Sequence, residues 1–119
     1  MRLLHTSDWH LGRALHGAPM LEHQREFLSW LVATALERQV DAVLVAGDVY
    51  DRAVPPTDAV AVLDEALAAF AAAEVPVVLI SGNHDSAVRL GFGSTLARHA
   101  GIHLRTDLSA LTDPVVVGD

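Results

Sequence analysis

Three short clusters of acidic, histidine and asparagine residues are the parts of this sequence that could do chemistry. They are Asp8-Trp9-His10, Gly47-Asp48-Val49-Tyr50-Asp51 and Gly82-Asn83-His84-Asp85. Carboxylate oxygens, imidazole nitrogens and amide oxygens suit Mn, Fe or Zn as ligands. The sequence contains no cysteine, so nitrogen and oxygen atoms must hold any metal ion. The clusters therefore indicate a metal site built from nitrogen and oxygen ligands.

The order of the clusters carries more weight than any one of them. The Asp-x-His pair alone is common by chance and fits a solvated turn. The Gly-Asp-x-x-Asp cluster alone fits a strand-to-loop turn, in which glycine lets the backbone bend sharply. Gly-Asn-His-Asp is more specific, because a turn requires neither asparagine nor histidine. All three in succession, each after a predicted strand, favour a single metal site.

Alternating strands and helices must position these clusters. Short apolar runs predict strands at residues 2–6, 41–46 and 75–80, of which the last two are expected to be buried. The spacing of apolar residues predicts helices at about 19–38 and 57–74. This βαβαβ order predicts a mainly parallel sheet with right-handed crossovers. The carboxyl ends of such strands share one edge, so the three clusters should meet there.

Each long helix should bury one face. For the first helix, the expected inward residues are Leu28, Leu31, Val32, Ala35 and Leu36. For the second, they are Val60, Leu63, Leu67 and Phe70. Either Thr57 or Asp58 is expected to cap the second helix, after the break at Pro55-Pro56. Beyond residue 86 a weaker pattern predicts a short helix at 94–99 and strands at 102–104 and 114–117.

Composition indicates a folded protein and limits its location. Of the residues, 51% are hydrophobic and 19% are charged. The longest purely apolar run, Ala66–Ala73, is far shorter than the roughly 20 residues of a membrane span. No secretory signal is recognisable at the start, so a cytoplasmic protein is expected. The net charge of −7 argues only mildly against a nucleic-acid substrate, because bound cations would cancel part of a carboxylate-rich site.

The three clusters together resemble the motifs of the calcineurin-like metallophosphoesterase superfamily, which run D-x-H, G-D-x-x-D and G-N-H-[DE]. The longer stretches at 3–12, 41–56 and 76–86 indicate a narrower group within the superfamily. They are similar to the SbcD family, the nuclease subunits of bacterial SbcCD exonucleases. The resemblance covers essentially the whole chain. It implies an α/β fold, in which this βαβαβ unit forms half of a two-sheet sandwich flanked by helices.

The resemblance also implies a role for each residue of the site. Asp8 and His10 would bind the first of two divalent ions, expected to be Mn²⁺. Asp48 would bridge both ions, and Asn83 would bind the second. His84 would be the catalytic histidine, with Asp51 orienting it.

The sequence lacks one part of the family pattern, the histidine motif that follows the three clusters. Complete members supply further histidines later in the chain, including a G-H-x-H motif. This sequence contains no G-H-x-H, and its later His99 and His103 flank Gly101 with the wrong spacing. Residues 1–119 are therefore expected to be the truncated N-terminal part of the nuclease domain. The second metal site would then be weak or empty, and the 119 residues alone would be inactive.

By resemblance, the parent function is metal-dependent hydrolysis of phosphodiester bonds at DNA ends, in double-strand-break repair, recombination and replication. The implied partners are DNA, an SMC-like ATPase of the SbcC type and a second copy of the nuclease subunit. Two alternatives stay open. A small-molecule phosphodiesterase would share the metal motifs but would not account for the opening His5-Thr6-Ser7-Asp8-Trp9-His10-Leu11-Gly12. A non-catalytic fragment would act only as a structural or binding module.

Overall fold

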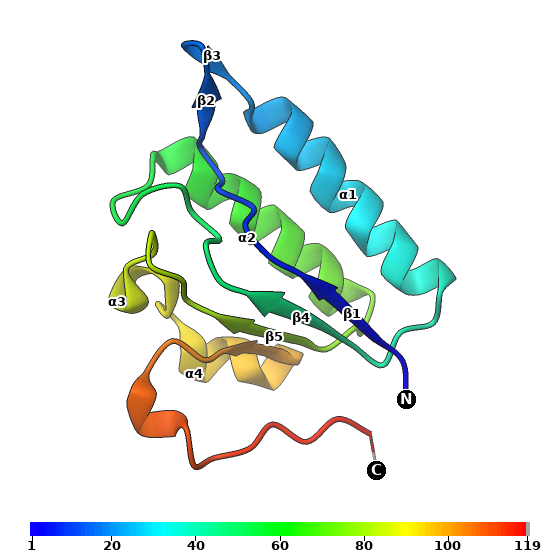
Figure 1. Cartoon of the computed structure of the whole chain (residues 1–119). Helices are drawn as coiled ribbons and strands as arrows, with labels where there is room; N and C mark the ends of the chain where they lie inside the picture. The colour runs from blue at the N-terminus through cyan, green and yellow to red at the C-terminus, as the bar shows by residue number, and fades with distance from the viewer. Residues whose placement is uncertain (119) are drawn as a thin grey trace.

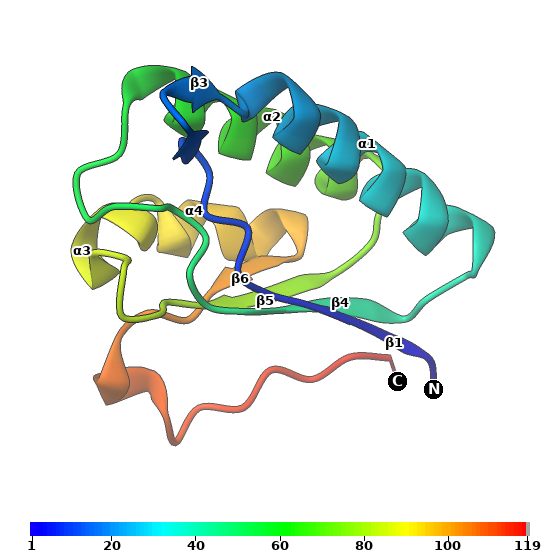
Figure 2. The ribbon, with the colours of Figure 1, turned by 45° about the horizontal axis from the view of Figure 1, so that its top comes forward.

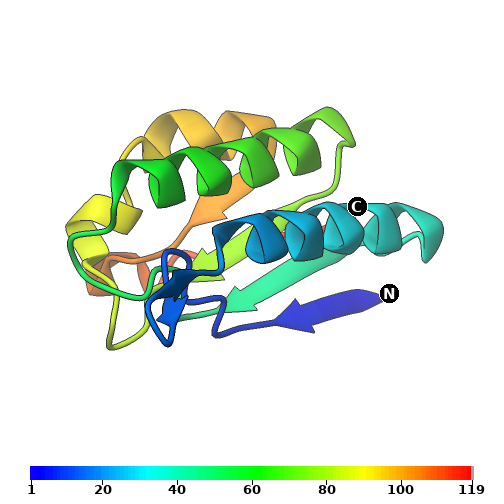
Figure 3. The ribbon, with the colours of Figure 1, turned by 90° about the horizontal axis from the view of Figure 1, so that it is seen from above.

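The computed structural model describes residues 1–118 and contains a four-stranded parallel sheet in the order β1-β4-β5-β6. The strands are β1 (Leu3–Thr6), β4 (Ala42–Ala46), β5 (Val77–Ile80) and β6 (Ile102–Leu104). All neighbouring pairs in this sheet are parallel. Figure 3 shows the arrowheads pointing to the same edge, where the loops that follow the strands gather. The α/β class and the parallel sheet predicted from sequence are confirmed.

The helices cover one face of this sheet (Figures 1 and 2). The long ones are α1 (Leu21–Glu37) and α2 (Thr57–Ala72), and the short ones are α3 (Ala87–Leu90) and α4 (Ser94–Ala97). Two 3-10 turns follow, η1 (Arg98–Ala100) and η2 (Leu108–Ala110). A small antiparallel hairpin, β2 (Ala14–Leu15) with β3 (Ala18–Pro19), precedes α1. Neither this hairpin nor α3 was predicted from the sequence. None of the helices within residues 1–118 is long and apolar enough to cross a membrane.

The core lies between the sheet and the two long helices. Alternate strand residues point into it, and the register pairs Val43 with Val77 and Val45 with Leu79. From α2, Phe70 is fully buried. Because this packing fixes the strands, it also fixes the loops that leave their carboxyl ends.

Several details of the predicted helices are wrong. Leu36 is 51% exposed and Val60 is 44% exposed, because α1 and α2 bury narrower faces than the spacing suggested. Ala59, Val62 and Ala66 face inward on α2 instead. Neither Thr57 nor Asp58 is the N-cap of α2. Pro56 takes that position, with no side-chain cap hydrogen bond.

The predicted strand at 114–117 is also wrong. These residues have no regular structure and form no strand ladder. They run along the sheet face opposite the helices (Figure 2). There Val115 and Val117, together with Leu3, Leu44 and Ile80, line a cavity of about 450 Å³. Val115 and Val117 line this apolar cavity with their side chains, while Val116 is exposed and the run forms no main-chain pairing with a strand.

Candidate metal centre

The loops after β1 and β4 run side by side and are joined through their main chains. The Asp8 amide donates to the Gly47 carbonyl at 3.0 Å, and the His10 amide donates to the Asp48 carbonyl at 2.9 Å. Leu11 then donates to Val49 and forms an isolated parallel bridge with Tyr50. The first two clusters therefore extend the β1–β4 pairing beyond the strands and meet at one edge of the sheet.

The backbone of these loops is strained at three of the predicted ligands. Asp8, His10 and Asp48 have φ values of 57°, 46° and 50°, in the left-handed region that side chains rarely adopt. Such conformations cost on the order of 1–3 kcal/mol each and persist where the surrounding structure enforces them. Residues under such strain cluster at functional sites, which agrees with their predicted role.

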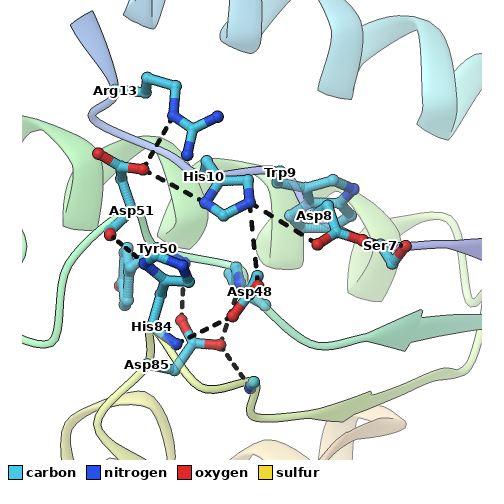
Figure 4. A network of polar contacts seen from close by, with 12 residues as sticks. Ser7, Asp8, Trp9, His10, Arg13, Asp48, Tyr50, Asp51, His84 and Asp85 are labelled. Atoms are coloured by element: carbon cyan, nitrogen blue, oxygen red, sulfur yellow. Dashed lines mark hydrogen bonds and ion pairs between the residues drawn. The ribbon is translucent and has the colours of Figure 1, made fainter.

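The ligand atoms of these three residues converge on one point. One atom each from Asp8, His10 and Asp48 lies within 4.8 Å of the others. His10 Nε2 is 3.7 Å from Asp8 Oδ1 and 3.9 Å from Asp48 Oδ2 (Figure 4). Two carboxylates and one imidazole in this arrangement form a donor set that a divalent transition metal accepts. The side chains of His10 and Asp48 are both 14% exposed, whereas that of Asp8 is 63% exposed, so the site opens to solvent on the side of Asp8.

The third loop reaches the same point because two glycines let the backbones approach. Gly47 has φ +89°, and a Cβ added to it would lie 3.1 Å from the Gly82 Cα. A Cβ on Gly82 would overlap both the main chain and the carboxylate of Asp48. Only glycine at position 82 therefore allows Asn83 and His84 to sit beside Asp48.

Asn83 faces the Asp48 carboxylate directly. With its amide nitrogen toward Asp48, it donates to both carboxylate oxygens at 3.2 Å. A half-turn of the carboxamide would put its oxygen there instead, and the carboxylate would repel that oxygen unless a cation lay between them. The pair is therefore placed as two oxygen ligands of a second cation would be, and the residues present fit the metal ions that the resemblance implies.

His84 touches the site through both its main chain and its ring. Its amide donates to Asp48 Oδ1 at 3.0 Å. Its Nδ1 lies 3.2 Å from the main-chain oxygen of Asp51. A carbonyl only accepts, so Nδ1 carries the proton of this contact and Nε2 is left free for another partner. The ring also meets His10 edge-on, with centroids 5.1 Å apart and planes at 83°.

The carboxylate of Asp51 contacts His10 and Arg13, and it is the carbonyl of Asp51 that lies beside His84. Asp51 Oδ1 is 3.3 Å from His10 Nδ1 and 3.0 Å from Arg13 Nε. His10 Nδ1 is buried and makes no hydrogen bond within residues 1–118, so the Asp51 carboxylate faces the ring as a nearby charge. The contact of Asp51 with His84 expected from the resemblance thus runs through the main chain.

Asp85 is a residue of this site that the sequence analysis did not single out. Its carboxylate accepts hydrogen bonds from three main-chain amides, those of Val49, Tyr50 and Gly82, at 2.8–3.1 Å. It thereby ties the second loop to the third (Figure 4). The feature of the sequence that could have identified Asp85 is its position as the fourth residue of the Gly-Asn-His-Asp cluster.

The hydroxyl group of Tyr50, whose amide donates to Asp85, stays uncharged. Burial raises the pKa of Tyr50 to about 12, with smaller contributions from Asp85 and Asp64. The hydroxyl therefore stays protonated at neutral pH and does not act as a base.

Comparison with known proteins agrees with this geometry. The family model for calcineurin-like phosphoesterases matches residues 1–114. A relative from Staphylococcus saprophyticus, the SbcD subunit of the nuclease SbcCD, is 37% identical over 120 residues. That alignment covers 100% of this chain and 32% of the relative, so the chain spans about a third of the relative's length. On the family match, which extends over all three loops of the site, the chain belongs to the calcineurin-like phosphoesterases.

Proposed function

We propose that this chain contributes the first metal site, and part of the second, to a metal-dependent nuclease that hydrolyses phosphodiester bonds at DNA ends. The observation that carries the proposal is the meeting of Asp8, His10, Asp48, Asn83 and His84 at one edge of the sheet. The likeness to a nuclease subunit supports DNA as the substrate, since the alignment covers the whole of this chain.

Each residue has a defined part in this proposal. Asp8, His10 and Asp48 hold the first ion, while Asp48 and Asn83 hold part of the second. Two such ions, when bound, supply an acidic water and positive charge for the phosphate oxygens. We assign His84 the transfer of a proton to the leaving oxygen from Nε2. For this step the ring must be the imidazolium, with one proton on Nδ1 bonded to the Asp51 carbonyl and a second on Nε2 for the leaving oxygen.

Asp51 has two tasks in this assignment. Its carboxylate places a negative charge 3.3 Å from the buried His10 Nδ1, and its carbonyl holds the His84 ring. The same residue therefore lies beside a ligand and orients the proton donor. This division modifies the expectation that its carboxylate serves His84.

The partners belong to the proposal as well. We propose an SMC-like ATPase of the SbcC type as the partner protein, a role in DNA repair and recombination, and Mn²⁺ as the ion. A homodimer is supported by three exposed apolar residues at four-residue intervals, Val88, Phe92 and Leu96, which are 85%, 87% and 78% exposed. A cytoplasmic location stays a prediction.

The first test of the function concerns the substrate. At its full natural length the protein is expected to cleave linear DNA with Mn²⁺ and to leave nucleoside cyclic phosphates intact at comparable concentration. Turnover should be measured on both substrates in the same buffer, with EDTA as the metal-free control. A higher turnover number on the small diesters would favour the small-molecule phosphodiesterase instead.

The second test concerns the number of metal ions. The 119-residue chain is expected to bind one Mn²⁺ tightly and to lack nuclease activity, because among residues 1–118 only the first site has three protein ligands. Metal analysis after dialysis measures this, and Asp8→Asn should remove the single ion. Two tightly bound ions with robust DNA cleavage would mean that other residues complete the second site. No binding at all would favour a structural or binding module.

A further inference from the structure

Gln24 links α1 to the metal-binding loop through its carboxamide. The residue lies in the first turn of α1, and its side chain reaches back to the loop that follows β1. Its Nε2 donates to the carbonyls of Trp9 and His10, at 3.1 and 3.0 Å. The amide of Gly12 donates to its Oε1 at 3.2 Å. Only one orientation of the carboxamide satisfies all three contacts, so the head group is fully used.

These contacts lie on the opposite side of the loop from the sheet. The amides of Asp8, His10 and Leu11 point toward the β4 loop, where carbonyls accept their hydrogen bonds. The carbonyls of Trp9 and His10 point the other way, toward Gln24. The loop is therefore held from both sides along the stretch that contains His10.

Packing holds Trp9 and Leu11 of the loop in the core, at 7% and 1% exposure, but leaves space between the loop and α1. A cavity of about 280 Å³ lies between the loop and α1, lined by residues that include Asp8, Trp9, Gln24 and Phe27. The helix itself is firmly anchored, because Leu28 and Leu31 are buried in the core. A hydrogen-bonding side chain on a rigid helix can thus fix a strained loop that has space beside it.

We infer that Gln24 is a positioning residue for the first metal site. It holds the loop of residues 8–12, which is left-handed at Asp8, His10 and Gly12, so that His10 and Asp8 face Asp48. This inference rests on the proposed function, because it assigns Gln24 to the metal ion that Asp8, His10 and Asp48 would bind. Gln24 itself touches no ligand atom in this assignment and acts only through the main chain. Residues that orient metal ligands typically change metal affinity by about 10- to 100-fold when replaced.

The test compares Gln24→Met with Gln39→Met. Methionine keeps the length of the side chain but makes none of the three hydrogen bonds, and Gln39 lies exposed just beyond the far end of α1. In metal-free protein, Gln24→Met should speed hydrogen exchange at the amides of His10, Leu11 and Gly12. It should also weaken Mn²⁺ binding by about 10- to 100-fold, measured from free Mn²⁺ by electron paramagnetic resonance. Gln39→Met should change neither.

A second variant keeps the proposal testable if Gln24→Met folds poorly. Gln24→Glu retains an acceptor for Gly12 but replaces the donor to two carbonyls with a repelling oxygen. Added negative charge alone would tighten cation binding, so weaker binding in Gln24→Glu, against Gln39→Glu, supports the positioning role. Unchanged exchange at residues 10–12, or unchanged Mn²⁺ affinity in a loosened loop, overturns it. If the unsubstituted protein binds no Mn²⁺, the proposed function fails, whereas the exchange rates still report whether Gln24 holds the loop.

Discussion

Asp48→Asn, in the protein at its full natural length, is expected to abolish metal-dependent hydrolysis. The carboxylate of Asp48 lies between the two predicted sites. Its Oδ2 faces His10 at 3.9 Å, while its Oδ1 accepts from the His84 amide and both oxygens face Asn83. Asparagine removes the negative charge and leaves one oxygen in place of two. One group can then no longer serve both ions, and the two-metal arrangement needs both together.

The measurement is the rate of DNA cleavage with saturating Mn²⁺, alongside the metal content of the purified variant. Asp41→Asn is the matched control, because Asp41 immediately precedes the amino end of β4 and Asp48 follows its carboxyl end. Circular dichroism should show that both variants fold, since the asparagine oxygen can still accept from the His84 amide. A wild-type rate in Asp48→Asn would remove Asp48 from the mechanism.

The four strands of the sheet and their parallel direction could be predicted from sequence because burial leaves a strong local signal. Val43, Val45, Val77 and Leu79 are apolar because they face the core beneath the helices, and the intervening Leu44, Val78 and Ile80 line the cavity on the opposite face. Once the strands are parallel, their carboxyl ends must share an edge, so the convergence of Asp8, Asp48 and Asn83 follows from topology. The fold and the composition of the site were accessible for this reason.

The hydrogen bonds and ion pairs within the site could not be predicted from the sequence in the same way. Which atom of Asp51 meets which histidine depends on loop backbone angles, and a motif does not encode them. The three amides that donate to Asp85 and the three groups that bind Gln24 are main-chain atoms, which every residue carries. Sequence reveals such contacts only through the side chain that makes them. The exposure of Val60 and Leu36 was missed for a related reason: helical spacing gives a face but not its width.

His84→Ala, in the protein at its full natural length, is expected to lower turnover by about 10²- to 10⁴-fold with metal content near normal. The substitution removes the ring whose Nε2 is free to meet the leaving oxygen. It keeps the main-chain amide that donates to Asp48 Oδ1 at 3.0 Å, so the bridging carboxylate should stay in place. Turnover with Mn²⁺ should therefore fall, while the amount of metal bound per chain stays near that of the unsubstituted protein. His99→Ala, at an exposed histidine in η1, is the matched control and should leave both unchanged.

Asp51→Ala is expected to differ from His84→Ala, because it should affect metal binding more than turnover. It keeps the carbonyl beside His84 Nδ1 but removes the carboxylate 3.3 Å from His10 Nδ1. Loss of the Asp51 carboxylate should therefore weaken metal binding. At saturating Mn²⁺ it should lower turnover less than His84→Ala does. If His84→Ala instead strips the metal, His84 is a ligand and its assigned role in proton transfer is wrong. If both variants lower turnover equally at saturating Mn²⁺, Asp51 acts on His84 through more than its carbonyl.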